Sequence, residues 1–88
     1  MSARHLVVHG TVQGVFFRAS AESEASRLGV AGWVRNRSDG TVEMVVEGDD
    51  AAVGQMVSWA GHGPERAEVT AVDVEDHPEE GHRGFAQR

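Results

Sequence analysis

The segment TVEMVVE, residues 41–47, has the most regular alternation of side chains in the chain. In an extended backbone, successive side chains point to opposite faces. One face of this segment carries only apolar side chains, which are Val42, Met44 and Val46. The opposite face carries Glu43, Val45 and Glu47. This pattern predicts a β-strand whose apolar face lies in the core.

The residues before this strand predict a tight turn and a further strand. SDG, residues 38–40, contains residue types that favour turns, and Gly40 can adopt a positive φ angle. The preceding segment AGWVRNR, residues 31–37, alternates like a strand. Two strands joined by a turn are therefore expected over residues 31–47.

The residues after it predict a helix and then another strand. Asp49 or Asp50 is expected to cap the helix. The apolar face of this helix consists of Val53, Met56, Val57 and Ala60. Gly61, Gly63 and Pro64 are expected to end it. AEVTAVDVED, residues 67–76, predicts a strand, and after a loop the final FAQR is compatible with a short closing strand.

The N-terminal third predicts a strand followed by a helix. HLVVH, residues 5–9, places Leu6 and Val8 on one strand face. Apolar residues then recur with helical spacing; they are Phe17, Ala21, Ala25 and Leu28. This helix is expected to begin near Arg18 and to end at Gly29, which suits a left-handed cap.

The expected element order is therefore β-α-β-β-α-β. Two split βαβ units of this length give an antiparallel sheet of four to five strands with both helices on one face. This is an α+β protein with the ferredoxin-like sandwich. Residues 1–88 are expected to form a single domain, because no linker or repeat interrupts them. The fold hosts enzymes, regulatory modules and RNA-binding modules, so function has to be argued from the site.

Composition narrows the function classes. The absence of cysteine excludes disulfides, cysteine zinc sites and a thiol nucleophile. The net charge of −6 argues against general binding to nucleic acid or acidic membranes. The strand at 41–47 also lacks the paired aromatics of an RNA-binding sheet. No segment has the features of a signal peptide or a membrane span, so a cytoplasmic protein is expected.

The stretch GTVQGVFFR, residues 10–18, has two interpretations. Its two glycines permit a backbone in which successive N–H groups converge on one point, and the following helix presents unsatisfied N–H groups. Arg18 would add a planar set of donors matched to phosphate oxygens. Alternatively, the stretch is a turn with Phe16 and Phe17 as core anchors and Arg18 in solvent. The lack of a Gly-Lys-Ser/Thr ending argues against a Walker-type magnesium–nucleotide site.

A second informative stretch is GWVRNRSDGTVEM, residues 32–44. Alternation places Asn36 on the same strand face as the core residue Val34. The Asn36 amide either satisfies the adjacent turn or holds a water molecule beside a bound anion. Arg35 and Arg37 fall on the opposite face, where solvation is expected, and Arg37 is a candidate for drawing anions toward the site.

Five histidines raise the question of a metal site. His5 and His9 share a strand face, but four residues of strand separate them by roughly 13 Å. One ion cannot span that distance with ligand bonds of about 2 Å. The remaining three, His62, His77 and His82, fall in expected loops without a ligand pattern. No metal site is predicted.

GTVQGVFFR followed by GWVRNRSDGTVEMVVEG resembles the acylphosphatase family, which carries a G-x-VQGV-x-FR signature and a GWVxN-x-x-DG-x-V signature. The resemblance implies the ferredoxin-like fold and hydrolysis of acyl phosphates to a carboxylate and inorganic phosphate, without metal or cofactor. It also implies that Arg18 binds the phosphate and that Asn36 orients the attacking water. The loop whose amides wrap the phosphate would consist of Thr11, Val12, Gln13, Gly14, Val15, Phe16 and Phe17.

The resemblance weakens after residue 60, where GHGPER stands in place of the family's Gly-Pro-Pro segment. This departure bears on stability and on the shape of the rim, and it leaves both signatures intact. The expected partner is a small-molecule acyl phosphate, and a monomer without nucleic-acid or membrane partners is expected. The alternative is a non-catalytic module that binds acyl phosphate or carbamoyl phosphate, because similar domains occur inside larger maturation enzymes.

Overall fold

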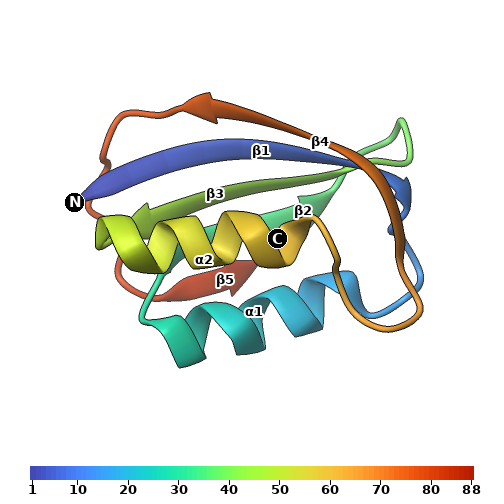
Figure 1. Cartoon of the computed structure of the whole chain (residues 1–88), viewed down its shortest axis with the longest axis horizontal. Helices are drawn as coiled ribbons and strands as arrows, with labels where there is room; N and C mark the ends of the chain where they lie inside the picture. The colour runs from blue at the N-terminus through green and yellow to red at the C-terminus, as the bar shows by residue number, and fades with distance from the viewer.

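A computed structural model describes all residues from Met1 to Arg88. The elements in chain order are β1 (Ser2–Thr11), α1 (Phe17–Leu28), β2 (Ala31–Asn36), β3 (Val42–Gly48), α2 (Asp50–Ala60), β4 (Glu68–Asp76) and β5 (Phe85–Gln87). The sheet order is β4-β1-β3-β2-β5, and both helices cover the same face of the sheet (Figure 1). The predicted ferredoxin-like α+β fold is confirmed.

The fifth strand differs from the antiparallel sheet that was expected. β4, β1, β3 and β2 pair antiparallel, but β5 pairs parallel to β2, with Val34 opposite Gln87. The sheet is therefore mixed. The segment between β4 and β5 crosses from one edge of the sheet to the other, which allows β5 to run in the same direction as β2.

The strand predicted over residues 41–47 is β3, and its predicted apolar face lies in the core. Val42, Met44 and Val46 are fully buried beneath the helices. The helices supply the other half of the core through the predicted stripes, with Phe17, Ala21, Ala25, Val53, Met56 and Ala60 all buried. Burying side chains of this size contributes about 1.5–3 kcal/mol for each large apolar group.

Glu47 lies on the opposite face of β3 and is only 4% exposed. Its Oε1 accepts the backbone N–H of Glu80 at 2.6 Å. Its Oε2 accepts those of Gly81 and His82, both at 3.0 Å. A buried carboxylate needs such partners, since leaving a charge unpaired in the interior is costly. Glu47 thereby holds the segment that leads into β5.

The helix ends follow the sequence in part. Gly29 adopts the left-handed conformation expected of a C-cap, with φ of 75°. α2 begins after Asp49, but the Asp49 side chain makes no capping hydrogen bond.

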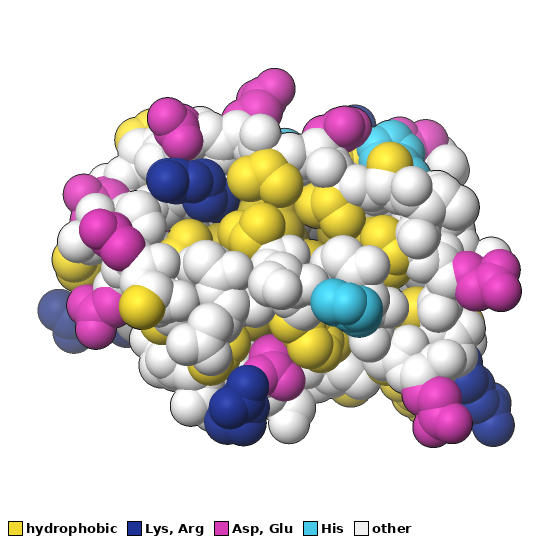
Figure 2. Space-filling view, viewed as in Figure 1, with side chains coloured by type: hydrophobic (Ala, Val, Ile, Leu, Met, Phe, Trp, Pro, Cys, Tyr) yellow, Lys and Arg dark blue, Asp and Glu magenta, His cyan; other side chains and the backbone are white.

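Neither helix has the length and apolar character needed to cross a membrane. On the helix-bearing face, acidic side chains are scattered around the periphery (Figure 2).

Candidate functional site

The connection from β1 to α1 and the turn from β2 to β3 lie at the same end of the molecule (Figure 1). The first of these, Val12–Phe16, contains two left-handed residues, Gly14 with φ of 73° and Phe16 with φ of 64°. Left-handed residues in a short connection turn successive N–H groups toward a common point, which is how backbone anion sites are built. The helix start that follows adds the positive end of its dipole.

The backbone N–H groups of this region have no acceptor within the protein. From Val12 to Ala19, no N–H donates to another backbone oxygen. The first donor of the helix is Ser20, whose N–H binds the Phe16 carbonyl at 3.0 Å. The first N–H groups of any helix lack intrahelical partners, but here the run of free donors extends back through the whole connection. Such a run of free donors, called the cradle below, can hold an anion.

Arg18 lies in the first turn of α1 and is half-buried. Its guanidinium makes neither a hydrogen bond nor an ion pair with any other residue, whereas Arg35 and Arg37 pair with Glu43 and Asp39. The guanidinium of Arg18 is therefore free to bind an external anion.

Asn36 is the last residue of β2, and its side chain is exposed and makes no hydrogen bond. It therefore does not satisfy the adjacent turn, which was one of its two interpretations. That turn is held instead by Asp39, whose Oδ1 accepts the hydroxyl of Thr41 at 2.6 Å and its N–H at 3.0 Å.

Arg18 and Asn36 line one pocket of about 270 Å³. The complete lining is Val12, Gly14, Phe16, Phe17, Arg18, Ala19, Asn36 and Gln87. Arg18 is the only charged residue among them, so the pocket is locally positive on an acidic protein. The two side chains singled out from separate stretches of sequence thus share one pocket.

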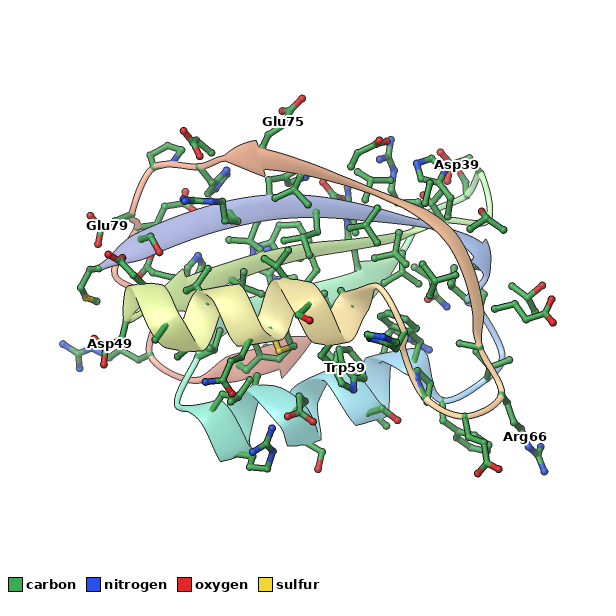
Figure 3. The ribbon with its side chains drawn as sticks, viewed as in Figure 1. Asp39, Asp49, Trp59, Arg66, Glu75 and Glu79 are labelled. Carbon is green, nitrogen blue, oxygen red and sulfur yellow. The ribbon has the colours of Figure 1, made fainter.

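The two adjacent phenylalanines have different roles. Phe17 is 2% exposed, and its ring packs on Trp59 with 5.2 Å between the ring centres. Trp59 points from α2 toward α1 (Figure 3). Phe16 is 71% exposed, so the alternative interpretation, in which both rings anchor the core, is wrong for Phe16. The two residues also differ in backbone conformation, because Phe16 is left-handed and Phe17 is the first residue of α1.

Two carboxyl groups near the site, those of Asp39 and Glu43, have lowered pKa values. A hydrogen bond from the Thr41 hydroxyl, then one from its N–H, and the charge of Arg37 hold the pKa of Asp39 below its ordinary value. Burial raises the pKa of Glu43, but hydrogen bonds from His5 and Arg35 outweigh it, so that pKa is also lowered. Glu43 and Asp39 therefore pair with Arg35 and Arg37, and neither carboxylate lines the pocket that contains Arg18.

The comparisons with known proteins point to one family. A family profile described as acylphosphatase matches residues 4–87. An acylphosphatase from Thiobacillus denitrificans is 52% identical, and the match covers 100% of this chain and 98% of that protein. The solved structure of an acylphosphatase from Bacillus subtilis is 37% identical, with a TM-score of 0.96 and coverage of 100% and 99%. One from Coxiella burnetii is 38% identical, with a TM-score of 0.95 and coverage of 99% and 92%.

The chain belongs to the acylphosphatase family. The predicted family and the predicted enzyme class, a hydrolase of acyl phosphates, are confirmed. The weaker resemblance expected after residue 60 does not shorten the match, which continues through β4 and β5.

Two pocket residues of this acylphosphatase-family chain were not predicted. Ala19 follows Arg18 in the first helical turn, and Gln87 comes from β5. Gln87 also donates to Glu22 on α1 at 3.2 Å. Its presence depends on the parallel pairing of β5 with β2, which no local pattern indicated.

Three residues of the predicted loop do not line the pocket. Thr11 is the exposed end of β1, and Val15 packs against the core. Gln13 turns away, and its amide donates to two carbonyls of the β2–β3 turn. Any contact that these residues make with a phosphate has to come from their backbone.

His5 and His9, the two histidines of β1, bind different carboxylates. Nε2 of His5 lies 2.7 Å from Glu43, and that of His9 lies 2.8 Å from Asp73. The two imidazoles are therefore engaged with different carboxylates on the sheet face opposite the helices.

Proposed function

We propose that this enzyme hydrolyses acyl phosphates in the pocket between α1 and the end of β2, with Arg18 and Asn36 as its catalytic residues. The backbone N–H groups of the Thr11–Phe17 loop and the helix start hold the phosphoryl oxygens, and Arg18 binds them through its planar donors. Asn36 orients the water. The observation that carries the proposal is that both side chains and the run of free amides meet at one pocket without internal partners.

The chemistry suits such a simple site. The water oxygen attacks phosphorus while the bond from phosphorus to the acyl oxygen breaks, and the electron pair leaves with the carboxylate. A carboxylate is a stable leaving group, so no general acid is needed. Phosphoryl transfer depends mainly on positioning and on stabilising charge on the equatorial oxygens. No Asp, Glu or His lines the pocket, so no side chain there can act as a general base. In the proposed reaction, the water's proton therefore passes to a phosphate oxygen of the substrate.

The cradle supplies the positive charge that a metal ion provides in many phosphoryl-transfer enzymes. The proposed reaction is therefore independent of metals and cofactors. The enzyme is further proposed to act as a monomer in the cytoplasm on small acyl phosphates, without nucleic-acid or membrane partners. The net charge of −6 supports the exclusion of nucleic acid and anionic membranes.

Phosphate release from acetyl phosphate and benzoyl phosphate, measured with and without EDTA, tests the proposal. Turnover that is insensitive to EDTA and lost in Arg18→Ala and Asn36→Ala is the expected result. Tight binding without turnover would instead favour a non-catalytic binding module. Comparison with carbamoyl phosphate and 1,3-bisphosphoglycerate would rank the natural substrates.

A further inference from the structure

Phe16 is a large apolar side chain that the fold does not use. It is 71% exposed, and its ring contacts no other aromatic ring, in contrast to the buried ring of Phe17. A single exposed apolar side chain is ordinary on a protein surface. The position of this one is not ordinary, because it lines the same pocket as Arg18 and Asn36.

The backbone at Phe16 also disfavours a phenylalanine. Its φ and ψ are 64° and 24°, and it is the only residue other than glycine with a positive φ angle. Glycine and asparagine adopt this conformation far more readily than a bulky side chain. Neither packing nor backbone geometry therefore accounts for an aromatic ring at this position.

The direction of a bound substrate suggests what the ring contacts. The amides and Arg18 surround the phosphoryl group, so the acyl group has to extend from the cradle toward the rim of the pocket. Phe16 stands on that rim in an exposed position, and the pocket lining also includes the exposed apolar side chain of Ala19. An aromatic acyl group would find both a ring and an apolar surface there.

We propose that Phe16 is a specificity-determining residue whose ring packs against the acyl group and favours acyl phosphates with an aromatic or extended apolar acyl portion. This inference rests on the proposed function of the same pocket. The strain of the left-handed phenylalanine is retained because the ring meets the substrate.

The ratio of kcat/KM for benzoyl phosphate to kcat/KM for acetyl phosphate tests the inference. In Phe16→Asn, this ratio is expected to fall by about 3- to 10-fold, mainly through KM for benzoyl phosphate, the scale of one lost aromatic pair. The same variant should melt a few degrees higher, because asparagine tolerates the left-handed conformation. Phe16→Trp is the matched control, because it keeps an aromatic ring and places an equally bulky residue in the left-handed conformation. In this variant, the ratio should stay near that of the wild type.

Three outcomes would overturn the inference. An unchanged ratio in Phe16→Asn means that the ring does not contact the acyl group. A lowered ratio that Phe16→Trp shares to the same extent means that the loop, not the ring, sets the preference. Failure of the wild-type protein to hydrolyse either substrate would overturn the proposed function, and this inference with it. Only the first two leave the proposed function standing.

Discussion

The side-chain amide of Gln13 donates to the carbonyl oxygen of Arg37 at 2.7 Å, and the same nitrogen lies 2.9 Å from the carbonyl oxygen of Thr41. Gln13 belongs to the connection that precedes Arg18, and Arg37 directly follows Asn36. These hydrogen bonds therefore tie the cradle to the strand end that carries the proposed water-orienting residue.

Gln13→Ala is expected to loosen this tie. Two hydrogen bonds of about 0.5–1.5 kcal/mol each are lost, so the free energy of unfolding should fall by about 1–3 kcal/mol. Turnover should fall by about 10- to 100-fold, because small misplacements of reacting groups are costly. Urea unfolding and phosphate release measure the two effects. Gln55→Ala is the control, because Gln55 is exposed on α2 and its side chain makes no hydrogen bond. Reduced stability with undiminished turnover of the folded enzyme would contradict a positioning role.

Arg18→Ala is expected to reduce turnover by about 10³- to 10⁵-fold, the range for an arginine that acts on a transferring phosphoryl group. Its melting temperature should stay near that of the wild type, because Arg18 makes no bond within the protein. Arg18→Lys should also fail, because an ammonium cannot reproduce the planar set of donors. Arg66→Ala is the control, since Arg66 extends into solvent from the loop after α2 (Figure 3). Near-normal turnover in Arg18→Ala would refute the assignment.

Asn36→Ala is expected to reduce kcat by about 10²- to 10³-fold, as for loss of one preorganised donor. If Asn36 orients water and not the phosphoryl group, inhibition by inorganic phosphate should change little. The inhibition constant for phosphate therefore separates the two roles. Ser38→Ala, in the adjacent turn, removes an exposed side chain without hydrogen bonds and should match the wild type. A parallel loss of phosphate inhibition in Asn36→Ala would show that Asn36 binds the anion itself.

The elements with strong local patterns were predicted correctly from the sequence. The alternation of Val42, Met44 and Val46 and the helical spacing of Phe17, Ala21 and Ala25 depend on residues a few positions apart. Burial of these faces then selects the same structure that the periodicity indicates. The left-handed cap at Gly29 is likewise a local property.

The contacts between distant residues were not predictable in this way. Glu47 binds the Glu80 amide across 33 positions of sequence, and nothing in the alternation of β3 distinguishes it from Glu43. The segment that Glu47 holds leads into β5, and the parallel pairing of β5 with β2 brings Gln87 to the pocket. Phe16 and Phe17 are adjacent residues of the same type, so the sequence does not distinguish them. In the structure, only Phe16 has a left-handed backbone.

Asp39 gives the β2–β3 turn a dependence on pH. Its pKa is lower in the folded protein than its ordinary value, chiefly because the Thr41 hydroxyl donates to it. A carboxyl with a depressed folded pKa contributes stability above its unfolded pKa, and this contribution is lost as pH falls through the folded pKa. Asp39→Asn should therefore melt slightly below the wild type at neutral pH, and the difference should shrink as pH falls below about 4. The difference should be small, because the carboxylate is exposed.

Thr41→Val supplies the matched background for this measurement, because it removes the main donor to Asp39 while conserving side-chain shape. In that background, the change in melting temperature caused by Asp39→Asn should be smaller at neutral pH and should vary less with pH. Melting curves of the wild type, the two single variants and the double variant between pH 7 and pH 2 complete the double-mutant cycle. A difference that persists unchanged down to the lowest pH would mean that the shape of the side chain, and not its charge, stabilises the turn beside Asn36.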